Sequence, residues 1–147
     1  MNSLLTTEIP QALSASILIL RAFIGSCLIV HGLGKLGMVG PGGANAMQGF
    51  VGWLQSLGVP FAAVQARLAM LAELVGGVFI IVGFFYRPAA IVCMVTLIVA
   101  AVIGHRGGGY LITNNPPGNE YALNLAVILL VMALLGPGPY SLDARLF

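Results

Sequence analysis

Apolar residues fall into four long stretches along the chain, each close to the length that crosses a lipid bilayer. The stretches cover residues 12–33, 61–85, 88–103 and 121–135. A hydrocarbon core about 30 Å thick is crossed by a helix of about 20 apolar residues. The pattern therefore predicts an all-α, polytopic membrane protein, in which residues 1–147 form a single domain built as a bundle of four transmembrane helices.

The connections between these spans are unequal in length. The segment FFYRPAA joins the second and third spans tightly, and Pro88 suits the first turn of a helix. Four crossings place both long connections on one side, called the outer side here, and both chain ends with Arg87 on the inner side. Within the first long connection, residues 44–57 are expected to form a short interfacial helix, where Trp53 suits the membrane–water boundary.

Composition excludes several classes of protein. Of the 147 residues, 59% are hydrophobic and 7% are charged, whereas a soluble domain carries about 25% charged residues. The net charge of +2, without runs of Lys or Arg, gives no indication of nucleic-acid binding. The N-terminal stretch MNSLLTTEIPQ is not typical of a signal peptide, because it has no basic residue and contains Glu8.

Two charged residues lie inside the apolar spans. Arg21 is nine residues into the first span and Glu73 is twelve into the second, depths of roughly 14 Å and 18 Å from opposite sides. A lone charge near the bilayer midplane costs several kcal/mol. We therefore expect Arg21 and Glu73 to form an ion pair. The pair could be structural, setting the register of two helices, or it could line a cavity and bind or protonate a ligand.

A second polar group gathers near the outer ends of the spans. It comprises His31, Lys35, Arg67, His105, Arg106 and Glu120. Three interpretations stay open: an interfacial polar cluster, a divalent metal site of two histidines and a carboxylate, and a site for a small molecule such as a quinone headgroup. The two cysteines, Cys27 and Cys93, fall at depths that differ by about 16 Å on straight helices, too far for a disulfide.

Three segments together resemble the DoxX family of small membrane proteins. They are RAFIGSCLIVHGLGKL, LGVPFAAVQARLAMLAELVGGVFIIVGFFYRPAAIV and NEYALNLAVILLVMALLGPGPYSLDARL, and they span residues 21–146. The resemblance implies a four-helix bundle in a bacterial inner membrane with cytoplasmic termini. It also places five residues at the polar motif positions of the family: Arg21, His31, Lys35, Glu73 and Glu120.

The resemblance favours a redox function. The family includes a subunit linked to thiosulfate:quinone oxidoreduction and membrane partners of thiol-handling enzymes. We therefore expect a quinone-linked membrane subunit for the oxidation of sulfur compounds or thiols, with no covalently bound cofactor. In this hypothesis Glu73 and Arg21 are catalytic, and the quinone is bound by His31, Lys35, His105 and Glu120. The alternatives are a non-catalytic scaffold for soluble oxidative-stress enzymes, working with a protein partner or as a homo-oligomer, and a small-molecule carrier.

Overall fold

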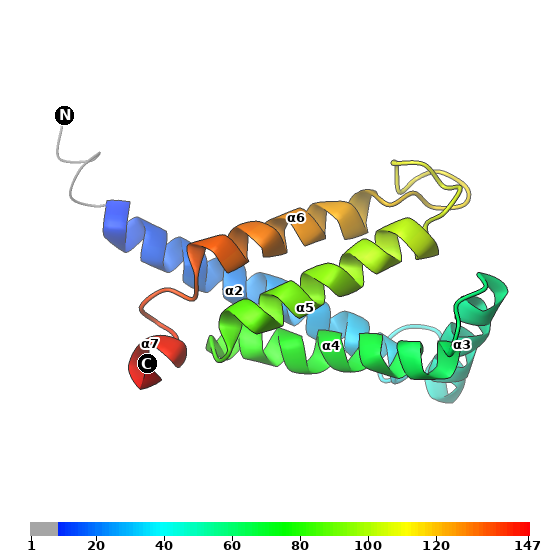
Figure 1. The fold of residues 1–147 in the computed structure, drawn as a ribbon, viewed down its shortest axis with the longest axis horizontal. Helices are drawn as coiled ribbons and strands as arrows, with labels where there is room; N and C mark the ends of the chain where they lie inside the picture. Colours follow the sequence, from blue (N-terminus) through cyan, green and yellow to red (C-terminus); the bar gives the residue numbers. More distant parts are fainter. Residues whose placement is uncertain (1–8) are drawn as a thin grey trace.

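Four long helices make up most of the computed structural model, which describes residues 9–147 (Figure 1). They are α2 (Ile9–Lys35), α4 (Ala62–Val82), α5 (Tyr86–Val99) and α6 (Glu120–Leu135), and a single π turn, η2 (Ala100–Gly104), extends α5. Each of the four predicted spans corresponds to one of these helices, with bounds that differ by a few residues. The expectation about a signal peptide concerns residues 1–11, of which residues 1–8 lie outside the described part of the chain.

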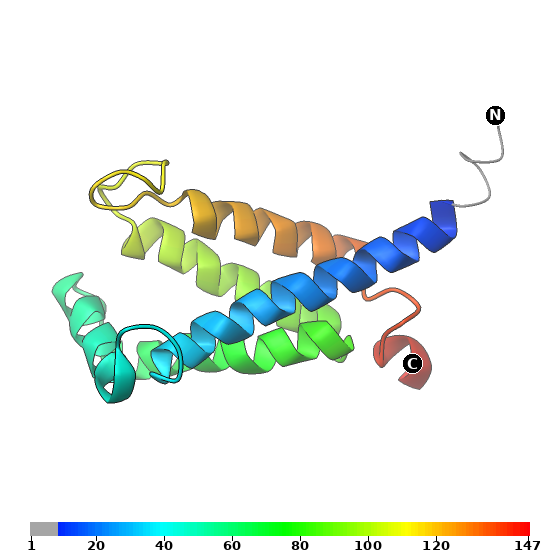
Figure 2. The same cartoon turned by 180° about the vertical axis from the view of Figure 1, so that it is seen from behind.

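The shorter elements lie at the two ends of the bundle. The turn η1 (Gly43–Asn45) leads into α3 (Ala46–Ser56), which confirms the helix expected over residues 44–57. A four-residue helix, α7 (Asp143–Leu146), follows α6 and is not predicted by the sequence. The outer end, with α3 and the connection 105–119, lies opposite the inner end, which carries the start of α2 and α7 (Figures 1 and 2). The two ends of the described chain thus share one end of the bundle, as predicted.

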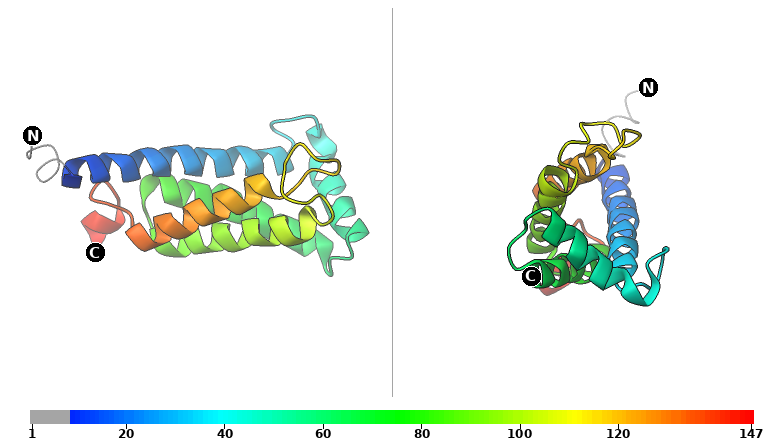
Figure 3. Two further views of the ribbon diagram at one scale, coloured as in Figure 1. Left: turned by 90° about the horizontal axis from the view of Figure 1, so that it is seen from above. Right: turned by 90° about the vertical axis from the view of Figure 1, so that its right-hand side faces the viewer.

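The helices form a ring in the order α2, α4, α5, α6 (Figure 3). The backbones of the pairs α2–α4, α4–α5 and α5–α6 pack closely, whereas those of α2 and α6 do not. Between α2 and α4 the contact is close, because a Cβ atom on Gly25 would lie 2.7 Å from the carbonyl oxygen of Gly77. Small residues permit such close approach of transmembrane helices.

The outward faces of the helices are apolar. Large hydrophobic side chains such as Phe23, Val102 and Leu134 are 66–73% exposed. Contiguous apolar surface on this scale marks contact with lipid. Within residues 9–147, three helices are long and apolar enough to cross a membrane, at residues 11–35, 62–82 and 86–104, and α6 is a shorter apolar helix of 16 residues. The chain is therefore a multi-pass helical membrane protein.

Arg21 is buried at the inner end and donates hydrogen bonds to four backbone carbonyls. Its Nε donates to Ile80 at 3.0 Å and its Nη2 to Ile81 at 2.7 Å, while Nη1 donates to Pro137 and Tyr140, both at 2.9 Å. The first two carbonyls belong to the last turn of α4, where no helical N–H remains to pair with them. The guanidinium thus joins three segments: α2, the end of α4, and the chain after α6.

The predicted ion pair between Arg21 and Glu73 is wrong. Arg21 lies level with Ile80 and Ile81, which are seven and eight residues beyond Glu73, or about 11 Å along α4. The helix α2 begins beyond the inner end of α4. A count of residues from the start of α2 therefore places Arg21 deeper in the bundle, and closer to Glu73, than it lies. The two charges are stabilised separately, Arg21 by carbonyls and Glu73 by Lys35.

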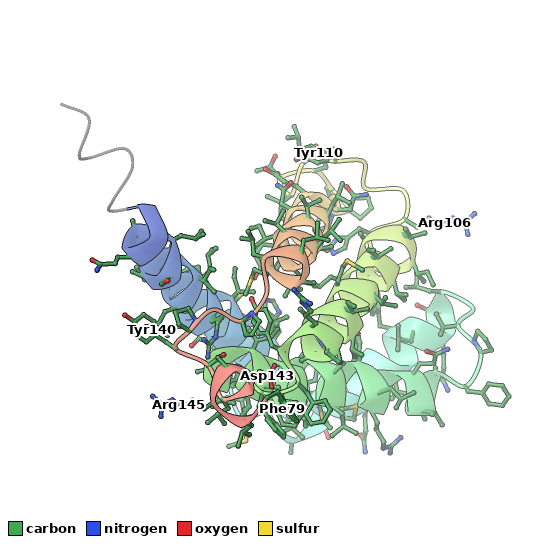
Figure 4. All side chains as sticks on the ribbon, turned by 60° about the vertical axis from the view of Figure 1, so that its left-hand side comes forward. Phe79, Arg106, Tyr110, Tyr140, Asp143 and Arg145 are labelled. Atoms are coloured by element: carbon green, nitrogen blue, oxygen red, sulfur yellow. The ribbon has the colours of Figure 1, made fainter. Side chains whose placement is uncertain are left out.

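The segment GPGPYSLDARL covers the inner end of the bundle. Asp143 accepts hydrogen bonds from the backbone N–H groups of Phe85 and Tyr86, both at 2.9 Å, and so caps the start of α5. The backbone N–H groups of Leu142 and Asp143 donate to the carbonyls of Val82 and Gly83. Figure 4 shows Asp143 in α7 beside the turn between α4 and α5.

Candidate ligand cavity

A cavity of about 400 Å³ lies in the outer half of the bundle. Its walls come from all four long helices and from α3, and most of the lining is apolar. The polar side chains that line it are His31, Lys35, Gln65, Glu73, Thr96, His105 and Tyr121. Six residues were predicted to be catalytic or quinone-binding, and four of them are brought together around this cavity: His31, Lys35, Glu73 and His105.

Lys35 and Glu73 form an ion pair on one wall. The Nζ atom of Lys35 lies 2.5 Å from Oε2 of Glu73, and the two side chains are 17% and 8% exposed. The ammonium also lies 5.1 Å from the ring centroid of Phe50 on α3, a cation–π contact. Lys35 ends α2, and its side chain turns towards the bundle instead of extending to the interface. The carboxylate of Glu73 is thereby neutralised at the edge of the cavity.

Tyr121 connects α6 to α2 where the two backbones are apart. Its hydroxyl lies 3.1 Å from Nε2 of His31 and also contacts the thiol of Cys27. The two rings are tilted against each other, with centroids 5.5 Å apart. Tyr121 is not among the site residues predicted from the sequence, although its place directly after Glu120, at the start of an apolar span, was an available signal.

His105 holds the outer connection and faces the cavity. Its Nδ1 lies 3.0 Å from the carbonyl oxygen of Pro117. Because a carbonyl can only accept, neutral His105 carries its proton on Nδ1, which leaves Nε2 as a hydrogen-bond acceptor. A ligand with a hydroxyl group could use that acceptor.

The remaining polar candidates lie away from the cavity. Glu120 accepts a hydrogen bond from the backbone N–H of Ile112 at 3.1 Å, so it fastens the connection 105–119. Arg67 donates to the carbonyl of Ala63 on its own helix. Arg106 points away from the bundle (Figure 4). With Arg21 at the inner end, two of the six predicted site residues, Arg21 and Glu120, have no contact with the cavity.

The metal interpretation finds no support among residues 9–147, where no three side chains of His, Cys, Asp or Glu gather closely enough to bind an ion. His31 and His105 are hydrogen-bonded to different partners, and Glu120 points to a third. Both cysteines are free thiols. Cys93 is buried and donates to the carbonyl of Ala72, which is a packing role.

The helix α3 covers the outer end of the cavity with Phe50, Trp53 and Leu54. The indole of Trp53 lies against Gly104, where a Cβ atom would approach a ring carbon to 2.8 Å. A glycine at this position is what allows the ring to pack against the end of η2. The helix α3 therefore packs on α4 and also reaches the end of η2.

Comparisons with known proteins agree with this architecture. The DoxX family model matches residues 16–106. The inner membrane protein YphA of Escherichia coli is 30% identical over 148 aligned residues, which cover 99% of this chain and all of that protein. The uncharacterized membrane protein Rv3486 of Mycobacterium tuberculosis is 28% identical, over 89% of this chain and 81% of its own. No solved structure gives a significant match. By the extent of the family match and of the likeness to YphA, the chain belongs to the DoxX family.

Proposed function

We propose that the protein is the quinone-binding membrane subunit of a redox system, located in a bacterial inner membrane. The observation that supports this best is the cavity, which has an apolar lining and an ion pair at a depth where the outer helix faces contact lipid. Its volume of about 400 Å³ falls in the range of small-molecule sites, about 300–1,000 Å³. Charged groups inside a membrane bundle are costly, and they generally mark a functional site.

The polar lining suits the two oxygens of a quinone ring. The carbonyls of a quinone accept hydrogen bonds, and Tyr121 and Lys35 carry donors at the cavity. The hydroxyls of a quinol donate, and Nε2 of His105 and the free oxygen of Glu73 are acceptors. Glu73 is also the group we propose to take up or release a proton, with its charge balanced by Lys35. Arg21 and Glu120 have no part in this site.

The electron donor that we propose is a sulfur compound or a thiol, oxidised together with a partner enzyme. The resemblance to the DoxX family supports this choice of donor. The cavity supplies the quinone side of such a system. The partner itself is identified only by this chemistry.

The test is quinone binding by the purified protein in lipid nanodiscs. We expect decylubiquinone to bind saturably, and Glu73→Gln and His105→Gln to weaken binding at least tenfold while the variants stay folded. Arg67→Gln is the matched control, because Arg67 is exposed and bonds only to its own helix. If the parent protein binds neither decylubiquinone nor a menaquinone analogue, the proposal fails. A stable co-purifying enzyme would then favour the scaffold hypothesis.

A further inference from the structure

We propose that the ligand reaches the cavity from the lipid, between α4 and α5, and that it is therefore an amphiphile with an apolar tail. This inference rests on the proposed function for the identity of the headgroup. The evidence for this route is the set of side chains at the rim of the cavity. Leu68 on α4 and Val95 and Val99 on α5 line the cavity, and each side chain is 49–58% exposed. These three side chains form an apolar mouth, whereas the other exposed residues of the lining, such as Trp53 and Tyr121, carry polar groups.

The geometry of α4 and α5 explains why a mouth forms there. The two helices are joined by the short turn at residues 83–85 and are tightly packed at Gly76, where the thiol of Cys93 leaves no room for a Cβ atom. Leu68 lies eight residues further towards the outer end, about 12 Å along α4. Over that length the helices diverge, as the ribbon shows (Figure 1). The cavity occupies the wide part of this wedge.

Two other gaps around the cavity are crossed by a helix or by polar side chains. Towards the outer aqueous side, α3 lies across the opening, and Trp53 rests on Gly104. Between α2 and α6, the hydroxyl of Tyr121 bridges to His31 and Cys27. The mouth between α4 and α5 is thus the side without a polar bridge or a covering helix among the described residues.

The chemistry of the mouth selects its ligand. Leu68, Val95 and Val99 offer no hydrogen bonds, so a polar molecule would lose its water there without compensation. An isoprenoid or alkyl tail loses nothing, because lipid and valine side chains are equally apolar. The headgroup can then lie at Lys35, Glu73 and Tyr121 while the tail stays in the bilayer. A water-soluble sulfur compound would not share this cavity.

Photo-labelling tests the route directly. A ubiquinone analogue with a diazirine at the end of a ten-carbon tail is bound to the parent protein in nanodiscs, irradiated, and mapped by peptide mass spectrometry. We expect labelling of α4 around Leu68 and of α5 around Val95–Val99, suppressed by excess decylubiquinone. Suppressible labelling of α2, α3 or α6 instead would overturn lateral access while leaving quinone binding intact. Absence of suppressible labelling would overturn the proposed function as well.

A pair of substitutions on α5 provides an independent test. Val99→Trp places a large ring in the mouth, and we expect it to weaken decylubiquinone binding at least tenfold. Val92→Trp is the matched control, because Val92 is exposed to a similar extent on the same helix but does not line the cavity. Equal binding by the two variants and the parent would contradict lateral access. Thermal unfolding of both variants checks that a loss of binding is not a loss of fold.

Discussion

Lys35, the last residue of α2, forms an ion pair with Glu73. The sequence had predicted Arg21 as the partner of this carboxylate. The pair links the outer end of α2 to the middle of α4 and brings the ammonium over Phe50 of α3. The side chain of Lys35 therefore connects three helices at the wall of the cavity. The ion pair also offsets the free-energy cost of a carboxylate in an apolar span, since Glu73 has a cation within hydrogen-bond distance.

We expect Lys35→Met to destabilise the protein more than Glu73→Gln does. Without Lys35, the buried carboxylate of Glu73 has lost its counter-charge, a change that costs about 3–5 kcal/mol for buried pairs. Without the charge on Glu73, Lys35 can extend its chain towards the interface and keep its ammonium hydrated. Thermal and denaturant unfolding in detergent measures both losses.

The double variant Lys35→Met/Glu73→Gln should lose less stability than Lys35→Met alone, because it leaves no unpaired charge. Arg67→Met serves as the control for removal of an exposed cation, with an expected change within about 0.5 kcal/mol. Losses that simply add in the double variant would show that the two side chains do not interact in the folded protein.

Arg21 should be the most sensitive position at the inner end. Arg21→Met leaves the carbonyls of the last turn of α4 and of the chain after α6 without donors, at about 1–3 kcal/mol for each buried group. We expect a loss of at least about 3 kcal/mol in unfolding free energy, and faster proteolysis of residues 137–147.

Arg21→Lys should recover little of that loss, because an ammonium cannot reproduce the planar fork of a guanidinium. Arg87→Met is the comparison, since Arg87 is an exposed arginine at the same end of the bundle. If Arg21→Lys were as stable as the parent, charge alone would be sufficient and the hydrogen bonds to the carbonyls would have little importance.

The long helices are predictable from sequence because apolar length is a direct physical requirement of the bilayer. The same holds for α3, where Trp53 and its apolar neighbours lie between two spans. The convergence of His31, Lys35 and His105 is also predictable, since each falls at the outer end of its span, whereas Glu73 falls near the middle of its span. Depth along a helix can be counted from the sequence, and these predictions depend on depth alone.

Pairing depends on the register between helices, which the sequence does not reveal. The approach of Gly25 to Gly77 sets α2 against α4 and brings Arg21 level with Ile80 and Ile81. The bond between Tyr121 and His31 depends similarly on the position of α6. The fold of GPGPYSLDARL over the inner end follows from unpaired carbonyls at the end of α4, and no periodic pattern marks it.

Asp143→Asn should destabilise the start of α5. The carboxylate accepts from two consecutive backbone N–H groups, at Phe85 and Tyr86, and its negative charge favours the N-terminus of the helix. The asparagine keeps one acceptor and loses the charge, so we expect a loss of about 0.5–2 kcal/mol in the unfolding free energy. Asp143→Ala, with no acceptor, should lose more.

Salt provides a check on the Asp143 interaction. The contribution of the charge to a helix dipole is screened by salt, whereas the hydrogen bonds are not. The difference between the parent and Asp143→Asn should therefore narrow at high ionic strength, and the difference between Asp143→Asn and Asp143→Ala should not. A parent and an asparagine variant of equal stability at low salt would contradict the capping role.

The last prediction concerns the orientation of the bundle in the membrane. We expect a cysteine at Thr113, in the outer connection, and one at Ala144, in α7, to react with a membrane-impermeant maleimide from opposite sides. Both positions are exposed, at opposite ends of the bundle. The parent protein is the background control, because Cys27 and Cys93 lie within membrane helices.

Lys35 and Arg106 at the outer end balance Arg87 and Arg145 at the inner end, so basic residues alone do not fix the orientation. The resemblance to the DoxX family predicts a cytoplasmic inner end, so Thr113→Cys should react in intact cells and Ala144→Cys only after permeabilisation. Reaction in the reverse order would overturn the cytoplasmic location of the termini and keep the bundle. Reaction of both positions from the same side would contradict the arrangement of four crossings, and with it the position of the cavity in the outer half of the membrane.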